Sequence, residues 1–192
     1  MIARIATRLT NALGKYVSMT DDEAEVYQYG FDIALYTLLS TTALLVIGAL
    51  AGKFVSTIIC VSLFYLNQSI GGGYHANSHL GCFVTMIMGL AFCLVLDTIR
   101  FATGIYYFCG AVSLSVLMIK PLVLHKNKRY LENRRTQFEL HSRLIVLFET
   151  LLFGLLVISR HEKLLSASSL SLLLCAVSRM VAWFISNKDT SG

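Results

Sequence analysis

Glycines, two histidines and a cysteine lie together in one segment of the chain, GGGYHANSHLGC, residues 71–82. A cysteine beside a histidine can perform nucleophilic catalysis, because the imidazole takes the thiol proton and the thiolate attacks a carbonyl carbon. Cys82 begins an apolar run, two or three residues after a helix cap that the sequence offers at Asn77 or Ser78. The free N–H groups at a helix amino terminus favour a thiolate. We therefore predict that Cys82 is a nucleophile, with packing in the core as the alternative.

Two histidines compete as the base for that thiol. In an unbroken helix His79 would lie one turn from Cys82, whereas His75 would lie two turns away, at ~10 Å. Three consecutive glycines, residues 71–73, disfavour a helix there, so His75 is expected in a loop that can fold back over the sulfur. Spacing alone leaves both histidines open.

The same segment also permits a metal site. His75, His79 and Cys82 have i, i+4 and i+7 spacing and would share one face of a continuous helix, as donors that suit zinc. The glycines and the lack of a neighbouring acidic residue argue against this alternative. We predict no metal and no cofactor.

The elements that position this segment follow from composition. Hydrophobic residues make up 56% of the 192 residues and charged residues only 14%, an apolar excess that requires a lipid phase. Disordered chains and secreted disulfide scaffolds are excluded by the same figures. We predict an all-α polytopic membrane protein with one membrane domain, residues 1–192, and about six hydrophobic helical segments. The apolar runs are 31–51, 54–70, 80–99, 101–119, 144–159 and 164–185, of which the second and fifth, at 17 and 16 residues, are short enough to be re-entrant.

The amino terminus has a different pattern. Apolar residues recur at helical spacing over residues 2–17, with basic residues between them. This pattern predicts an amphipathic helix in the membrane interface, within residues 1–19, or a soluble helix packed on the bundle. Thr20 and Glu23 have the spacing of a capping box, which predicts that a new helix starts there.

The basic residues predict the orientation of the chain. Both termini, the segment 71–78 and the connection 120–143 fall on the side that carries most lysines and arginines, which is the cytoplasmic side. Within that connection Lys126, Lys128 and Arg129 are expected to attract an acidic peptide tail or anionic lipid, with an ordinary solvated positive-inside loop as the alternative. Nucleic-acid binding is not expected, because no aromatic residues are interleaved with this charge.

Two charged residues lie deep inside apolar runs, several residues from either end. Glu149 and Arg179 occur at similar distances from the predicted cytoplasmic ends of the last two runs. An unpaired charge in the membrane is costly, so a structural ion pair is expected, with a proton or peptide pathway as the alternative. The cysteines other than Cys82 are expected to be small buried hydrophobes, without disulfides: Cys60, Cys93, Cys109 and Cys175.

The run GGGYHA, with Cys82 seven residues after His75 at a cytoplasmic membrane boundary, resembles the accessory gene regulator B (AgrB) family. Those proteins are polytopic cysteine endopeptidases that process a quorum-sensing propeptide, and the resemblance extends over nearly the whole chain. It implies that His75 is the base and Cys82 the nucleophile. One departure is that family members often have an arginine several residues before the histidine, where this chain has Asn67, Gln68 and Ser69.

The resemblance also implies the partners. An AgrD-type propeptide is the expected substrate, the phospholipid bilayer the expected environment, and a homodimer the expected assembly. Gln68, Gly73 and His79 are expected to contact the substrate. Cleavage would pass through a Cys82 thioester and allow cyclisation to a thiolactone signal peptide. The alternatives are a metal-dependent membrane hydrolase and a peptide transporter or scaffold.

Overall fold

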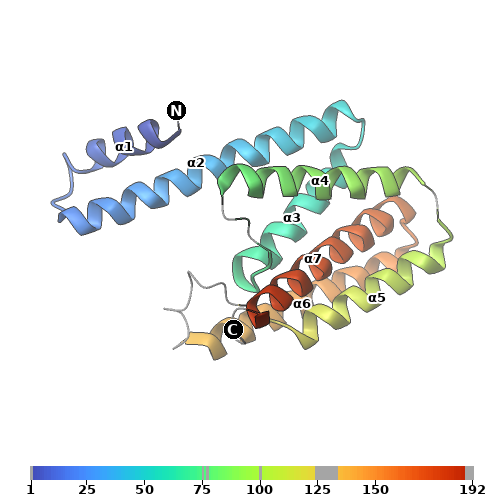
Figure 1. Cartoon of the computed structure of the whole chain (residues 1–192). Helices are drawn as coiled ribbons and strands as arrows, with labels where there is room; N and C mark the ends of the chain where they lie inside the picture. The colour runs from blue at the N-terminus through green and yellow to red at the C-terminus, as the bar shows by residue number, and fades with distance from the viewer. Residues whose placement is uncertain (1, 75, 77, 100, 124–133, 189–192) are drawn as a thin grey trace. The chain divides into compact units, whose positions relative to one another are not determined.

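The structure is a computed structural model that describes residues 2–74, 76, 78–99, 101–123 and 134–188, without the side chains of His79 and Lys188. These residues form seven α-helices and no β-strand, which confirms the predicted all-α polytopic fold (Figure 1). The helices are α1 (Ile2–Leu13), α2 (Asp21–Leu50), α3 (Phe54–Ile70), α4 (His79–Thr98), α5 (Thr103–Ile119), α6 (Arg135–Ser159) and α7 (Glu162–Lys188).

The chain forms two compact units, residues 1–47 and 48–192. In the first unit, α1 buries its small residues Ala6 and Thr10 and exposes Arg4 and Arg8. The helix ends at Leu13, earlier than the sequence pattern predicts, because Gly14 follows and glycine is a poor helix former.

The predicted capping box at the start of α2 is confirmed. The Thr20 N–H donates to Glu23 Oε2 at 2.8 Å, and the Glu23 N–H donates to Thr20 Oγ1 at 3.3 Å. From Asp21 the helix continues for 30 residues, about 45 Å, which exceeds the ~30 Å hydrocarbon core of a bilayer. Its acidic first turn is fully exposed, as expected for residues that lie in water.

The second unit is a bundle of α3 to α7 in which α7 is the central helix. This helix contacts α3, α4, α5 and α6, and it is the most buried of the long helices (Figure 1). Around it lies a core of Tyr106, Leu114, Leu117, Val146, Phe153, Leu165, Leu172, Cys175 and Ala176. All five cysteines are free thiols; Cys60, Cys93 and Cys175 are buried as predicted, whereas Cys109 is only half-buried.

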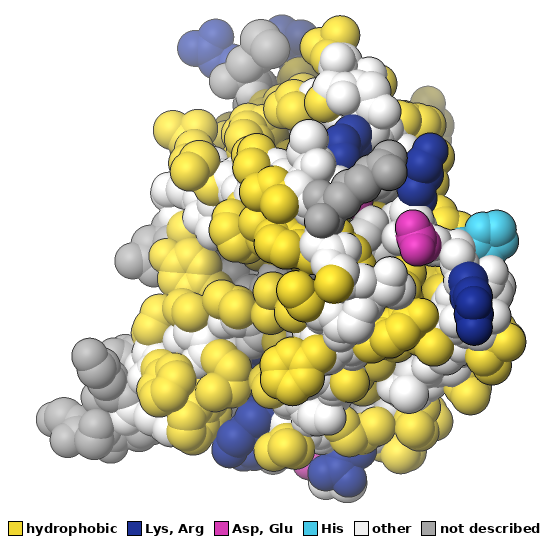
Figure 2. Space-filling view, turned by 90° about the vertical axis from the view of Figure 1, so that its right-hand side faces the viewer, with side chains coloured by type: hydrophobic (Ala, Val, Ile, Leu, Met, Phe, Trp, Pro, Cys, Tyr) yellow, Lys and Arg dark blue, Asp and Glu magenta, His cyan; other side chains and the backbone are white. Residues whose placement is uncertain are grey.

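Four helices are long and apolar enough to cross a membrane: α2, α4, α6 and α7. The shorter apolar helices are α3 and α5, with 17 residues each. The fifth apolar run is part of a longer helix, because α6 begins at Arg135 and has 25 residues. The first turns of α6 are polar, so hydropathy does not detect them. An exposed i,i+4 ion pair between Arg135 and Glu139 stabilises the helix there. Figure 2 shows hydrophobic side chains over most of the face in view, as a lipid-facing surface requires.

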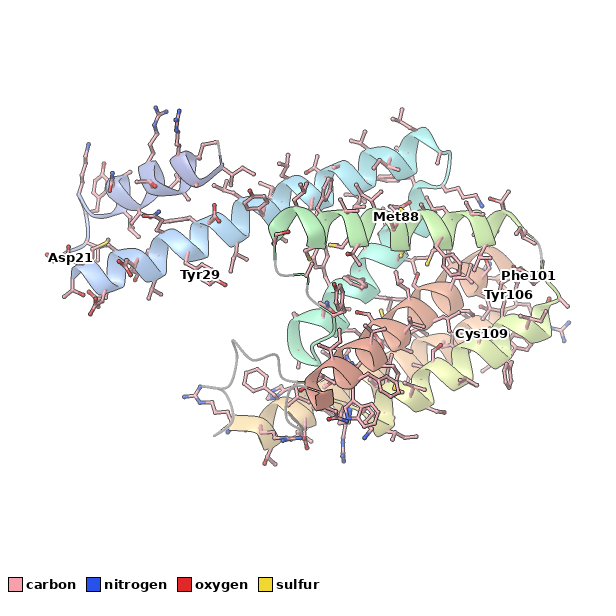
Figure 3. The ribbon with its side chains drawn as sticks, in the orientation of Figure 1. Asp21, Tyr29, Met88, Phe101, Tyr106 and Cys109 are labelled. Carbon is pink, nitrogen blue, oxygen red and sulfur yellow. The ribbon has the colours of Figure 1, made fainter. Side chains whose placement is uncertain are left out.

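Consecutive helices of the second unit alternate in direction, so their termini gather at two ends (Figure 1). At one end, Asp97 of α4 joins α3 and α7: Lys53 Nζ lies 2.6 Å from its Oδ2, and Ser166 Oγ donates to its Oδ1 at 2.7 Å. We call this the aspartate end. Here the Tyr106 hydroxyl donates to the Ile99 carbonyl at 3.3 Å, and its ring lies edge-on to Phe101, which holds the connection from α4 to α5 (Figure 3).

The opposite end carries the segment between α3 and α4. We call it the glycine end and define it by residues 67–74, the carboxyl terminus of α5 with residues 120–123, the first turns of α6, and Ser178 and Arg179 of α7. The predicted reactive segment therefore lies at this end.

Candidate active site

Cys82 lies in the first turns of α4. Ser78 precedes this helix in an extended conformation, and its Oγ accepts the Gly81 N–H at 3.0 Å. The Cys82 N–H donates to the Ser78 carbonyl at 3.0 Å, and the residue is half-buried. The prediction of a cap at Ser78 is confirmed, although Cys82 is the fourth residue of the helix, slightly farther from the cap than predicted. Cys82 thus lies near the amino terminus of α4, which is the positive end of the helix dipole.

The two candidate bases differ in their position relative to α4. His79 is the first residue of the helix, one turn before Cys82, and its side chain is not described. His75 lies outside the described residues, in the segment that precedes the helix. The continuous helix that the metal alternative requires does not exist, because Ser78 is extended and residues 71–74 are not helical. Ser78 therefore interrupts the helix that the metal alternative requires.

The glycine turn, residues 71–74, is anchored by backbone hydrogen bonds to distant parts of the chain. The Val123 N–H donates to the Gly71 carbonyl at 2.9 Å. The Tyr74 N–H donates to the Ser178 carbonyl at 3.2 Å and to Ser178 Oγ at 3.1 Å. Gln68 Nε2 donates to the Tyr74 carbonyl at 2.8 Å. Because that carbonyl belongs to the peptide bond between residues 74 and 75, the backbone is held where His75 begins.

Close packing explains why glycines occupy this turn. A Cβ atom at Gly71 would collide with the Arg179 guanidinium, and one at Gly72 would collide with the Val123 carbonyl oxygen. Gly72 also has φ +71°, a region that L side chains rarely adopt. Gly73 is buried against Gln68 and Ser178. The amide of Gln68 and the backbone of Gly73 are thus parts of the turn, while substrate contact by either remains a prediction.

Arg179 lies beneath this turn and is 1% exposed. Its Nη2 donates to the Asn67 carbonyl at 3.1 Å and to Asn67 Oδ1 at 3.2 Å. Its Nη1 donates to the Pro121 carbonyl at 3.1 Å, with longer contacts to the Lys120 and Leu117 carbonyls. The guanidinium therefore binds the carboxyl ends of both α3 and α5.

Asn67 connects Arg179 to Glu149. Asn67 Nδ2 donates to Glu149 Oε1 at 2.7 Å, while its oxygens accept from the guanidinium. In the described part of the chain, no direct hydrogen bond or ion pair joins Glu149 to Arg179. The expected direct pair is thus replaced by a bridge through Asn67, which donates to Glu149 through Nδ2 and accepts from Arg179 Nη2 through its carbonyl and amide oxygens. Sequence reasoning noted Asn67 only as a departure from the family pattern.

The basic cluster Lys126, Lys128 and Arg129 lies outside the described residues. Just before it in the chain, Lys120 Nζ lies 4.4 Å from the centroid of the Trp183 ring, a cation–π contact between the end of α5 and α7. This contact brings a basic residue and an amphipathic aromatic residue to the glycine end.

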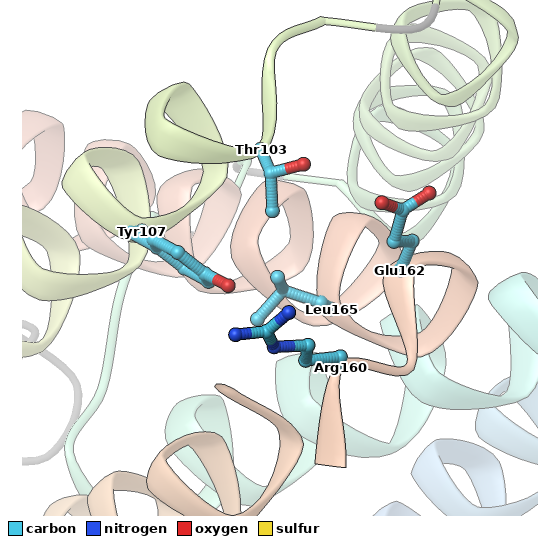
Figure 4. A pocket seen from close by; sticks show the side chains of 5 residues that line it. All are labelled: Thr103, Tyr107, Arg160, Glu162 and Leu165. Atoms are coloured by element: carbon cyan, nitrogen blue, oxygen red, sulfur yellow. The ribbon is translucent and has the colours of Figure 1, made fainter. Parts of the chain in front are cut away.

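A surface pocket lies at the aspartate end and is separate from this site. It is lined by Thr103, Tyr107, Arg160, Glu162 and Leu165 (Figure 4). Along α7, Leu165 and Ser178 are separated by about 20 Å at the helical rise. The pocket therefore contributes nothing to the surroundings of Cys82.

One known protein family matches this chain. The model of the family described as accessory gene regulator B matches residues 6–180, a range that includes Cys82, the glycine turn and Arg179. No curated protein and no solved structure matches the chain. The multi-pass helical architecture and this match agree with each other. The chain therefore belongs to the accessory gene regulator B family, whose members process a propeptide in the agr quorum-sensing system.

Proposed function

We propose that this protein is a membrane cysteine endopeptidase that cleaves an AgrD-type propeptide at the cytoplasmic face. Cys82 is the nucleophile and His75 the base. The observation that carries the proposal is the position of Cys82: it is half-buried in the first turns of a capped helix, directly after an anchored glycine turn. Family membership supports the substrate class.

The proposed reaction has two acyl transfers. His75 takes the Cys82 proton, and the thiolate attacks a peptide carbonyl carbon to form a tetrahedral intermediate. The C–N bond then breaks, the amine leaves with the proton from His75, and a thioester to Cys82 remains. A thiol of the bound peptide attacks that thioester, which releases a thiolactone and restores the Cys82 thiol. Removal of the cleaved tail drives the sequence, because forming a thioester from an amide is uphill.

His75 is preferred to His79 because of the backbone around it. The Tyr74 peptide is fixed on both sides, by Ser178 and by Gln68, so His75 follows an ordered anchor. A base that belongs to the turn can approach the sulfur from outside the helix, whereas His79 shares the helix with Cys82.

Substrate recruitment is proposed to use the basic connection. With the glycine end in the cytoplasm, Lys126, Lys128 and Arg129 meet the acidic tail of a propeptide that lies in the membrane interface. A homodimer is part of this proposal. Neutralising the three residues together should raise KM and leave kcat nearly unchanged, which is the signature of lost uniform binding. An unchanged KM in the triple variant would remove recruitment from the proposal.

The decisive experiment replaces Cys82 and a matched cysteine. Cys82→Ser should abolish cleavage of a synthetic propeptide by the reconstituted enzyme and remove the acyl-enzyme from intact-mass spectra. Cys109→Ser is the control, because Cys109 is also a half-buried free thiol, in the middle of α5 (Figure 3). It should retain activity. Cleavage by Cys82→Ser would exclude the covalent mechanism.

The histidines are tested in the same assay. His75→Ala should be as damaging as Cys82→Ser, because members of one catalytic unit are not additive. His79→Ala should cost far less. The reverse result would assign the base to His79.

A further inference from the structure

We propose that Arg179 is a positioning residue for catalysis: from α7 it fixes the glycine turn, residues 71–74, which directly precedes the proposed base His75 in the chain. The inference rests on the proposed function and adds to it a residue 97 positions beyond the nucleophile in the sequence.

The buried charge is stabilised mainly by helix ends. A helix carboxyl terminus carries partial negative charge, and Arg179 donates to backbone carbonyls near the ends of α3 and α5. Hydrogen bonds connect the Glu149 carboxylate to it only through Asn67. A guanidinium suits this geometry, since its fork directs separate nitrogens at separate acceptors. Arg179 therefore fixes the distance between the ends of α3 and α5.

The glycine turn starts from the same carbonyl that Arg179 binds. The backbone carbonyl oxygen of Asn67 accepts a hydrogen bond from the Gly71 N–H at 2.9 Å and another from Arg179 Nη2 at 3.1 Å. Gly71 packs so closely on the guanidinium that any side chain there would collide with it. The beginning of the turn is thus defined by Arg179.

The end of the turn is held by the neighbour of Arg179. Ser178 accepts the Tyr74 N–H with both its carbonyl and its hydroxyl oxygen. Ser178 and Arg179, two consecutive residues of α7, therefore hold the two ends of the turn. In the sequence, His75 directly follows Tyr74, the last residue of the turn. A displacement of ~1 Å between reacting groups can cost about 100-fold in rate, so this anchorage is a kinetic determinant.

The aspartate end supplies a matched control. Asp97 also joins polar side chains of three helices, with partners Lys53 and Ser56 on α3 and Ser166 on α7. It is remote from the glycine turn. Loss of either network should weaken helix packing, but only loss of the Arg179 network should slow the chemistry.

The test compares Arg179→Lys with Asp97→Asn in reconstituted full-length enzyme. Lysine keeps the positive charge but concentrates its donors on one nitrogen, so it cannot reach both helix ends. With a synthetic propeptide, Arg179→Lys should lower kcat by about 100-fold with KM within about threefold, and Asp97→Asn should change kcat by less than about threefold. Alkylation of Cys82 by a small haloacetamide should still occur in both variants, which shows that the thiol is present and accessible.

Two results would overturn the inference: wild-type kcat in Arg179→Lys, or an equal loss of kcat in Asp97→Asn. If Arg179→Lys does not fold, as judged by size exclusion in detergent, Ser178→Ala takes its place. That change removes only the hydroxyl contact to Tyr74 and should lower kcat by about tenfold, a partial loss of the same anchorage. An unchanged kcat in Ser178→Ala would then overturn it.

The outcome is separable from that of the proposed function. Cleavage by Cys82→Ser defeats the covalent mechanism whatever Arg179 does. Inactive Cys82→Ser together with fully active Arg179→Lys defeats only the role of Arg179.

Discussion

The two ends of the α3 to α7 bundle both join helices through charged residues, but they do so in different ways. At the aspartate end, side chain meets side chain, and the pair is partly exposed, at 26% for Lys53 and 12% for Asp97. At the glycine end, the Arg179 side chain is 1% exposed and binds mainly backbone carbonyls. A partly exposed ion pair tolerates small shifts of its helices, whereas a buried guanidinium between helix termini fixes backbone positions. The difference indicates that backbone positions are fixed more firmly at the glycine end, where the predicted reactive segment lies, than at the aspartate end.

The largest expected effect comes from a methyl group at the glycine end. Gly71→Ala places a Cβ against the Arg179 guanidinium and near Ser142 Oγ, so the turn must shift and cleavage should fall by more than about 100-fold. Gly104→Ala is the matched change near the aspartate end, where a Cβ would meet nothing within 4 Å. It should leave cleavage unchanged. Equal activity of the two variants would show that the turn tolerates displacement.

The second effect concerns the bridge between the two buried charges. Asn67→Leu removes the amide that joins Glu149 to Arg179 and leaves the carboxylate without this donor. Breaking such a buried contact should lower the free energy of unfolding by about 3–5 kcal/mol. Denaturant titration in mixed micelles, followed by tryptophan fluorescence, measures this loss. A loss below about 1 kcal/mol would mean that Asn67 bridges the charges without stabilising them.

The third effect is the corresponding change at the aspartate end. Asp97→Asn removes the ion pair with Lys53 while an amide can still bond Ser166. Because both partners are partly exposed, the loss should be about 1 kcal/mol in the same titration. If Asp97→Asn costs more than Asn67→Leu, the contrast between the two ends is wrong.

The smallest effect concerns Trp183. Trp183→Leu removes the cation–π contact with Lys120 and should cost about 0.5–1 kcal/mol of stability. Cleavage at saturating propeptide should not change, because Trp183 has no contact with the glycine turn among the described residues. Thermal unfolding monitored by circular dichroism and the cleavage assay check the two halves of this prediction.

Local features of the fold were predictable from the sequence. Six apolar runs appear as six helices, and two predicted caps are present: Thr20, which has Glu23 three residues later, and Ser78, which lies two residues before an apolar run. The start of α6 was missed because its first turns are polar, so hydropathy does not identify them as helix. The i,i+4 ion pair between Arg135 and Glu139 is the feature that indicates a helix there. Asp97 was also missed, although Lys53 and Asp97 border adjacent apolar runs on the same predicted side.

The anchorage of the reactive turn could not be predicted. Its partners are 104 residues apart for Tyr74 and Ser178 and 112 for Asn67 and Arg179, so no spacing rule relates them. Arg179 was expected to seek an acidic partner because charge is visible in sequence. The free carbonyls of helix termini are not visible there, since every residue type carries them.

The dependence of the turn on α7 has a consequence for biogenesis. During translation, Cys82 and His75 are complete long before Ser178 and Arg179 are added, and at about 5–20 residues per second the gap lasts about 5–20 s. Until the last helix inserts, the nascent chain holds Cys82, the proposed nucleophile, without the anchors of the turn. Proteolytic competence would then appear only with the completed chain, so a ribosome-bound intermediate would not attack neighbouring peptides.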